Sequence, residues 1–407
     1  MYAKGATRVP IREPEGSPLY DATATEADEP SSAGSTKRRL RFTGDNEFQL
    51  EVRRRVSAHL RAAGRPERGG SAMYAKTAVI LAAFVSIYVL LVFVATAWWH
   101  VLPLAAALGL TIVAIGFNIM HDANHEAFSE RQWVNRAMMM TLDLVGGSSH
   151  FWRWKHNVFH HTFVNVVGYD TDINLIGLGR LSPHQPHAWF HRWQHLYVWL
   201  LYGAFALKWQ LYDDFRLALT GRMAQHSVPR PRGLQWVVFF GGKLLFLSLA
   251  FAIPLVLHPI WAVAATYVVT AVVLGIVLAV VFQLAHCVEE AGFPITAEPG
   301  RMGTAWAVHQ VETSVDFARE NRMACWLLGG LNFQIEHHLF SRICHVNYPV
   351  IAPIVERTCH DFGIRYRHNA TFLGAVRSHY NWLREMGRAP ILPSADASAS
   401  QGVATRA

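Results

Sequence analysis

The chain has 407 residues and a formal net charge of +8 at neutral pH. Hydrophobic residues make up 52% of it and charged residues only 16%, which favours a membrane protein over a water-soluble one of two or three domains. The positive charge suits loops that face anionic lipid head groups or an acidic protein partner, whereas no module of interleaved basic and aromatic residues indicates nucleic-acid binding.

The first 70 residues differ in composition from the rest of the chain. They are rich in Pro, Ser, Gly and charge, and they lack the apolar run of a signal peptide. We therefore expect residues 1–70 to be a disordered tail, residues 71–385 to form one membrane domain, and residues 386–407 to be a second disordered tail.

Four apolar segments lie in the membrane domain, at about residues 77–99, 102–120, 234–257 and 260–284. Each is long enough to cross a hydrocarbon core of about 30 Å as a helix, and short turns join them into two hairpins. Neither hairpin tip carries Lys or Arg, whereas residues 37–68 carry ten, so the positive-inside rule places both termini in the cytoplasm. Lys243 falls inside the third segment, and we expect its ammonium group to snorkel to the cytoplasmic edge.

Histidines gather where the chain leaves the membrane on this side. The motif HDANH at residues 121–125 ends the second apolar segment, and its spacing of four stacks His121 and His125 on one face of a helix. The motif HNVFHH at residues 156–161 repeats this spacing with His156 and His160. In an α-helix the adjacent His161 points about 100° away from His160, so the three residues suit two metals at once.

Two later segments add imidazoles at the same depth. The fourth apolar segment ends at His286, which matches His121 in position if the two hairpins are aligned. The motif QIEHH at residues 334–338 then supplies His337 and His338. Imidazole is a ligand for transition metals, and eight imidazoles exceed the needs of one ion. Two metals with four or five nitrogen ligands each keep open positions for dioxygen, so the pattern predicts two irons rather than a closed structural zinc site.

Other side chains near these motifs are candidates for supporting roles. Four polar residues interleave with the histidines and are expected to hydrogen-bond a bound imidazole or hold a water: Asp122, Asn157, Gln334 and Glu336. A ninth ligand position is left open among His309, His345 and Asn332. Three aromatic side chains are expected to line a dry path for an apolar substrate: Trp152, Trp154 and Phe159.

The motifs HDANH, HNVFHH and QIEHH resemble, in order and rough spacing, the three histidine boxes of the membrane fatty acid desaturases, and the likeness extends from about residue 118 to residue 366. The resemblance implies an all-α integral membrane fold in which four transmembrane helices in two hairpins carry a cytoplasmic helical cap with a histidine-rich di-iron site. It also implies an acyl substrate in a bent tunnel beneath the irons. Gln334 in place of a histidine resembles the front-end members and their linoleoyl-type bacterial relatives.

We therefore predict a desaturase that uses dioxygen and two electrons to put a cis double bond into an acyl-lipid or acyl-CoA. Side-chain acids and bases cannot break an unactivated C–H bond, so this chemistry needs a metal. The sequence contains no HPGG signature of a fused haem domain, so we expect an external electron donor, a ferredoxin or a b-type cytochrome with its reductase. The expected location is a bacterial inner membrane.

Two alternatives stay open. A di-iron lipid hydroxylase on the same scaffold would carry the same histidine motifs. A metal-binding or metal-transporting membrane protein without catalytic activity is more remote, because such proteins normally place ionisable ligands within their spans, whereas these lie at one face.

Overall fold

The computed structural model describes residues 40–224, 226–296 and 300–389. Helices dominate this part of the chain, and four helical segments are long and apolar enough to cross a membrane: Ser71–Val94, Trp98–Asn124, Leu234–Leu257 and Ile260–His286. These segments confirm the predicted helical class and the four candidate spans. Their limits differ somewhat from the predicted ones, since the first span begins at Ser71 rather than near residue 77.

Three of the four spans consist of successive α- and π-helical elements. The first contains α2 (Ser71–Val89) and η1 (Leu90–Val94), and the second contains α3 (Trp98–Ile115), η2 (Gly116–Met120) and α4 (His121–Asn124). The third contains α10 (Leu234–Leu247), η6 (Ser248–Ala252) and α11 (Ile253–Leu257), whereas the fourth is one helix, α12 (Ile260–His286).

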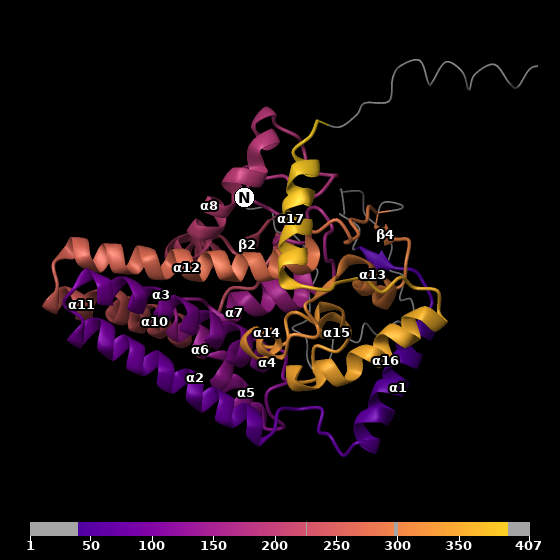
Figure 1. The fold of residues 1–407 in the computed structure, drawn as a ribbon, viewed down its shortest axis with the longest axis horizontal. Helices are drawn as coiled ribbons and strands as arrows, with labels where there is room; N and C mark the ends of the chain where they lie inside the picture. The colour runs from indigo at the N-terminus through magenta and orange to yellow at the C-terminus, as the bar shows by residue number, and fades with distance from the viewer. Residues whose placement is uncertain (1–39, 225, 297–299, 390–407) are drawn as a thin grey trace, which may run out of the picture.

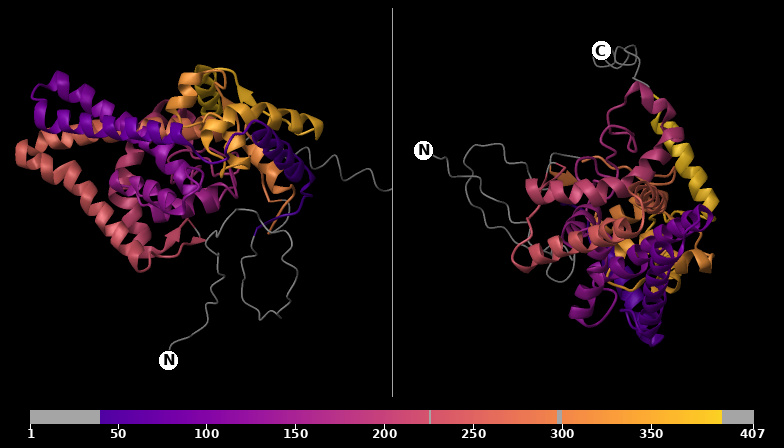
Figure 2. Two further views of the ribbon diagram at one scale, coloured as in Figure 1. Left: turned by 90° about the horizontal axis from the view of Figure 1, so that it is seen from below. Right: turned by 90° about the vertical axis from the view of Figure 1, so that its left-hand side faces the viewer.

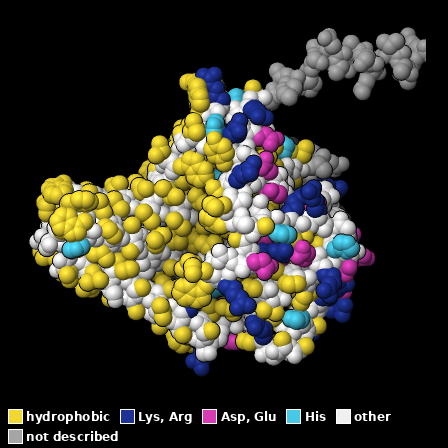
Figure 3. Space-filling view, viewed as in Figure 1, with side chains coloured by type: hydrophobic (Ala, Val, Ile, Leu, Met, Phe, Trp, Pro, Cys, Tyr) yellow, Lys and Arg dark blue, Asp and Glu magenta, His cyan; other side chains and the backbone are white. Residues whose placement is uncertain are grey.

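The two hairpins extend together from one end of the molecule (Figures 1 and 2). Apolar side chains cover this end, whereas charged side chains gather at the opposite end (Figure 3). Some of the apolar residues are highly exposed, such as Val256 at 83% and Leu244 at 69%. A continuous apolar surface of this size is typical of contact with lipid.

Shorter helices form the rest of the molecule, which we call the cap. Between the hairpins these are α5 (Gln132–Met139), α6 (Thr141–Leu144), α7 (Ser149–Trp152), η3 (Arg153–His160), η4 (Trp189–Trp193), α8 (Gln194–Lys208), η5 (Trp209–Asp213) and α9 (Asp214–Thr220). After the second hairpin they are α13 (Trp306–Thr313), α14 (Arg322–Leu327), α15 (Gln334–Leu339), η7 (His345–Asn347), α16 (Tyr348–Asp361) and α17 (Phe372–Met386).

Three pairs of two-residue strands form in the described part of the cap, and two of them join segments that are far apart in the sequence. Strands β1 (Arg41–Phe42) and β4 (Arg301–Met302) pair in parallel, as do β5 (Asp316–Phe317) and β6 (His368–Asn369). Strands β2 (Arg222–Met223) and β3 (His226–Ser227) form an antiparallel pair. The first pair fastens the start of the described chain to the segment before α13.

Helix α1 (Glu47–Ala62) corrects the expectation of a tail that is disordered up to residue 70. Its residues at spacings of four are apolar and buried against α13, α15 and α16: Phe48, Val52, Val56 and Leu60. The expectation is therefore wrong for residues 40–70. The apolar face of α1 is not obvious in the sequence, because charged residues interrupt it. At the other end, Met386 is buried at the end of α17, so the ordered chain also extends past residue 385. Residues 1–39 and 390–407 lie outside the described part of the chain.

Lys243 does not snorkel to the membrane edge, which corrects a second expectation. Its ammonium group is buried and lies 2.8 Å from a carboxylate oxygen of Asp214 at the start of α9. It also donates to the backbone carbonyls of Gly146, at 2.6 Å, and Gln210, at 3.2 Å. A fixed anion and two carbonyls thus offset the cost of burying this cation, which attaches the third span to the cap.

Candidate metal centre

Eight histidines from four separate segments meet in the cap, at the end of the spans opposite the hairpin tips. Helix α4 supplies His121 and precedes His125, η3 and the residue after it supply His156, His160 and His161, the end of α12 supplies His286, and α15 supplies His337 and His338. All eight are buried, and none exceeds 6% exposure. The convergence of these residues, which the sequence predicted, is present in the structure.

The eight imidazoles divide into two groups and a residue between them. The first group is His121, His125, His156 and His337, whose candidate ligand atoms all lie within 4.8 Å of one another. The second is His160, His286 and His338, within the same limit. The ring centroid of His161 lies 4.6 Å from that of His125 in the first group and 4.3 Å from that of His338 in the second. The cluster can therefore serve two ions.

The second histidine motif is π-helical, not α-helical as the sequence analysis assumed. The backbone N–H of His161 donates to the carbonyl of His156, five residues earlier, at 2.9 Å. Such wider turns are rare and often occur at functional sites. As a result His156 and His161 lie side by side, with 3.2 Å between their Nε2 atoms. His160 lies instead in the second group, with 4.8 Å between its ring centroid and that of His286.

Burial sets the charge state of most of these rings. It lowers the pKa of His125, His156, His161, His337 and His338 well below the ordinary value, and the neighbouring imidazoles lower it further. These rings are therefore neutral at physiological pH. Each neutral imidazole carries one nitrogen lone pair, which is the form that binds a metal.

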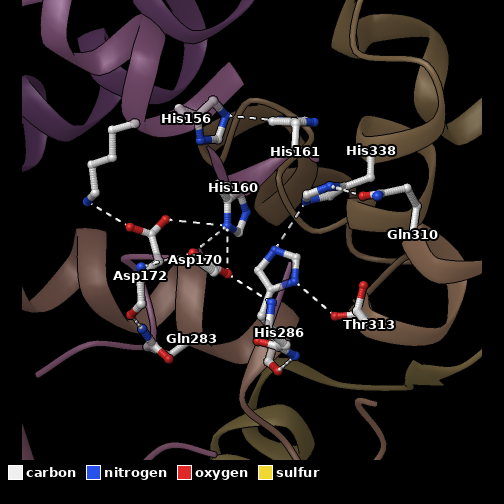
Figure 4. Close-up of polar contacts among 12 residues, drawn as sticks. His156, His160, His161, Asp170, Asp172, Gln283, His286, Gln310, Thr313 and His338 are labelled. Carbon is white, nitrogen blue, oxygen red and sulfur yellow. Dashed lines mark hydrogen bonds and ion pairs between the residues drawn. The ribbon is translucent and has the colours of Figure 1, made fainter. Parts of the chain in front are cut away.

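The positions of the ring protons test whether the cluster fits a metal. His286 Nδ1 lies 3.1 Å from the carbonyl oxygen of Thr313, and His338 Nδ1 lies 2.9 Å from Oε1 of Gln310 (Figure 4). Both oxygens accept, so both Nδ1 atoms carry the proton and both Nε2 atoms carry the lone pair. These two Nε2 atoms are 3.3 Å apart and cannot hydrogen-bond to each other. A cation between them satisfies both.

Other ring nitrogens in the cluster need a partner as well. Within the described residues, four of these buried atoms have no hydrogen-bond partner: Nε2 of His125, His160 and His337, and Nδ1 of His156. Buried polar atoms of this kind are usually satisfied, so several of them in one place indicate a bound group. The donor set is all imidazole nitrogen, which suits a transition metal.

Asp170 contacts an imidazole of the cluster, although it was not among the residues expected from the sequence. Its carboxylate oxygens lie 3.2 and 3.3 Å from His160 Nδ1, deep in the cap (Figure 4). Burial alone would lower the pKa of His160, but the Asp170 carboxylate overrides it, and the net effect is a raised pKa. The acidic pair in the sequence YDTD just after the second motif was a signal for this role.

Three of the four polar residues expected to support a bound imidazole take other partners. Asp122 accepts from His345 Nδ1 at 2.8 Å, and Asn157 exchanges hydrogen bonds with Asn124. Glu336 accepts from the Tyr366 hydroxyl at 2.9 Å. The amide nitrogen of Gln334 is buried with no hydrogen-bond partner in the described part of the chain. The oxygens that face imidazoles of the cluster belong instead to residues 10 to 28 positions away from them in the sequence: Asp170, Gln310, Thr313 and Tyr348.

The three residues considered for a ninth ligand position lie outside both groups. Both ring nitrogens of His345 are occupied, by Lys76 Nζ at 3.1 Å and by Asp122. His309 is buried against the ring of Phe42. Asn332 donates to the carbonyl of Ala318 at 3.4 Å.

The three aromatic residues expected to line a substrate path lie in two different places. Trp152 stacks on His156, with 5.2 Å between ring centroids and 23° between planes, so it borders the cluster. Trp154 and Phe159 pack instead in a hydrophobic cluster with Leu217 and Phe239, on the side of α9 and α10.

Comparisons with known proteins agree with this geometry. A family model described as fatty acid desaturase matches residues 96–370. A sn-1 linoleoyl-lipid 6-desaturase from Arthrospira platensis is 37% identical over 358 residues, which cover 88% of this chain and 97% of that protein. A protein of the same name from Synechocystis sp. is 36% identical over 87% of this chain and 99% of its own length. An acyl-lipid (8-3)-desaturase from Physcomitrium patens is 37% identical over 84% of this chain and 72% of its own length. The chain therefore belongs to the fatty acid desaturase family.

Proposed function

We propose that the eight histidines hold two irons and that the protein uses them to desaturate the acyl chain of a membrane lipid. The observation that carries this proposal is the convergence of eight buried imidazoles at the ends of the candidate spans opposite the hairpin tips, where the Nε2 lone pairs of His286 and His338 face each other. The family and the all-nitrogen donor set support iron and dioxygen as the reactants.

The reaction removes one hydrogen atom from each of two adjacent carbons. Dioxygen, two electrons and two protons enter with these hydrogens, and two water molecules leave. The irons supply the oxidising chemistry that no side chain has. The protein's own residues fix the imidazole rings through Asp170, Gln310 and Thr313, and they keep the surroundings dry.

We propose an acyl-lipid rather than an acyl-CoA substrate. Three relatives that span most of this chain carry acyl-lipid or linoleoyl-lipid in their names. Two of those names specify the 6 position, which supports a new double bond near the carboxyl end of the chain. The exposed apolar surface of the spans gives a lipid substrate direct access from the bilayer.

We further propose that the cap and both termini face the cytoplasm and that a separate ferredoxin or b-type cytochrome delivers the electrons there. The density of Lys and Arg in residues 37–68 and its absence from the hairpin tips support this orientation. The same positive charge favours an acidic donor. In a bacterium the protein would then lie in the inner membrane.

Fatty-acid analysis of a host that lacks this activity tests the proposal. Expression of the protein should produce a new unsaturated acyl chain in the lipid fraction, and the variant His160→Ala should not produce it. Hydroxylated acyl chains instead would identify a hydroxylase on the same scaffold. If neither product appears while the protein is present and contains iron, an acyl-lipid substrate is wrong.

A further inference from the structure

The two groups of histidines differ in what holds the outer nitrogens of their rings. In the second group, each Nδ1 faces an oxygen that accepts a hydrogen bond: those of His160, His286 and His338 face Asp170, Thr313 and Gln310, in that order (Figure 4). All three rings are therefore fixed with Nε2 directed into the cluster. One of the three oxygens belongs to a carboxylate.

The Asp170 carboxylate is itself held in place. The backbone N–H groups of Asn165 and Asp172 donate to it, each at 2.9 Å, and it is buried. Asp172 adds a second carboxylate, 3.6 Å from His160 Nδ1, and forms an ion pair with Lys155 at 2.7 Å. A fixed negative charge thus lies directly behind His160.

The first group has no such arrangement in the part of the chain that the structure describes. The hydroxyl of Tyr348 lies 3.2 Å from His337 Nδ1, but a hydroxyl carries no net charge. Nδ1 of His156 faces no hydrogen-bond partner there. Three acids stand next to histidines of this group in the sequence, and each has other partners: Asp122 contacts His345 and Cys344, Glu126 pairs with Arg342, and Glu336 accepts from Tyr366.

We propose that the two metal positions are inequivalent and that the position of His160, His286 and His338 holds its iron more tightly. A carboxylate behind a ligating imidazole fixes the ring and increases its basicity, and the loss of such a partner typically weakens metal binding by about 10–100-fold. This inference rests on the proposed function, because it assumes that both groups hold iron. Asp170 then acts as a positioning residue, because it affects the metal only through His160.

A chelator titration of the purified protein tests the inequivalence. The wild type should lose its irons in two separate steps, the second at the higher chelator concentration. Asp170→Asn should move the second step to a chelator concentration lower by about 10–100-fold, whereas Asp170→Glu should restore part of the difference. The matched control Tyr348→Phe lies behind the other group and should leave the second step unchanged.

Mössbauer spectra give a readout that a general loss of stability would not produce. The wild type should show two distinct iron environments, and Asp170→Asn should change one of them. If Asp170→Asn does not fold, Gln310→Glu replaces it, because it places a carboxylate behind His338 in the same group. This variant should shift the second step to higher chelator concentration.

The outcomes separate this inference from the proposed function. A wild-type protein without iron contradicts the proposed function. A wild-type protein with two irons that leave in one step, or a Tyr348→Phe variant that shifts the second step as much as Asp170→Asn does, overturns the inequivalence alone.

Discussion

At the scale of single residues, position next to a histidine motif did not determine which side chains support the rings. Asp122 follows His121 in the chain, yet its carboxylate points to His345 and Cys344. Asp170, ten residues after His160, hydrogen-bonds to an imidazole of the cluster instead. Hydrogen-bond partners depend on how the segments pack, which a single sequence does not reveal, so the ligand candidates were predictable while the oxygens behind them were not.

Asp122→Ala should therefore lower stability without emptying the cluster. The change leaves the Nδ1 of His345 and the thiol of Cys344 buried without their acceptor, which should cost about 1–3 kcal/mol. Thermal unfolding and iron content measured on the same sample check this expectation. Asp170→Asn serves as the comparison, since it should lower iron binding. An Asp122→Ala protein that unfolds like the wild type but lacks iron would show that Asp122 acts on the metal centre.

At the scale of elements, the spans and their order could be predicted because apolar runs of this length have few other uses. The π-helix at residues 153–160 could not, since the spacing of the motif fits an α-helix equally well. Helix α1 was missed for a related reason, because mostly polar residues, including Glu51 and three successive arginines, separate its four buried apolar positions. Its burial depends on α16, which lies about 300 residues later in the chain.

Helix α1 should contribute to the stability of the cap. Leu60→Ala removes a buried side chain from the hydrophobic cluster that α1 shares with α15 and α16, and such a change typically costs about 2–5 kcal/mol. Leu50→Ala on the same helix is the control, because Leu50 is 67% exposed. Thermal unfolding in detergent measures both. Equal behaviour of the two variants would mean that α1 does not pack on the cap.

The ion pair between the third span and α9 should be pH-sensitive once it is broken. Burial raises the pKa of Asp214 to about 6 even though Lys243 opposes the shift. Lys243→Met leaves this carboxylate buried without its cation and should cost about 3–5 kcal/mol near neutral pH. A carboxyl with a raised folded-state pKa is protonated more readily in the folded protein, so stability rises as pH falls through that pKa. The variant should therefore be more stable at about pH 5 than at about pH 8.

The double variant Lys243→Met with Asp214→Asn provides the control for this pair. It carries no buried charge at either position, so it should recover much of the lost stability and most of the pH dependence should vanish. Thermal unfolding across the same pH range measures both effects. A single variant whose stability does not change with pH would show that Asp214 carries no charge in the folded protein.

At the scale of the whole molecule, the apolar hairpins and the charged cap imply a defined orientation in the membrane. A cysteine introduced at Trp261, near the tip of the second hairpin, should react with a membrane-impermeant thiol reagent applied to intact cells. A cysteine at Arg54, on α1 in the cap, should react only after the membrane is opened. The parent protein corrects for its four native cysteines, three of which are buried. The reverse labelling pattern would place the cap outside the cytoplasm.

Iron content is the most direct test of the whole account. Elemental analysis of the purified wild-type protein should give about two irons per chain, as expected for eight imidazole ligands shared between two ions. Replacing His338 by Ala should lower this ratio, whereas replacing the exposed His360 on α16 should leave it unchanged. A wild-type protein that contains zinc or copper in place of iron, or no metal at all, would contradict the account.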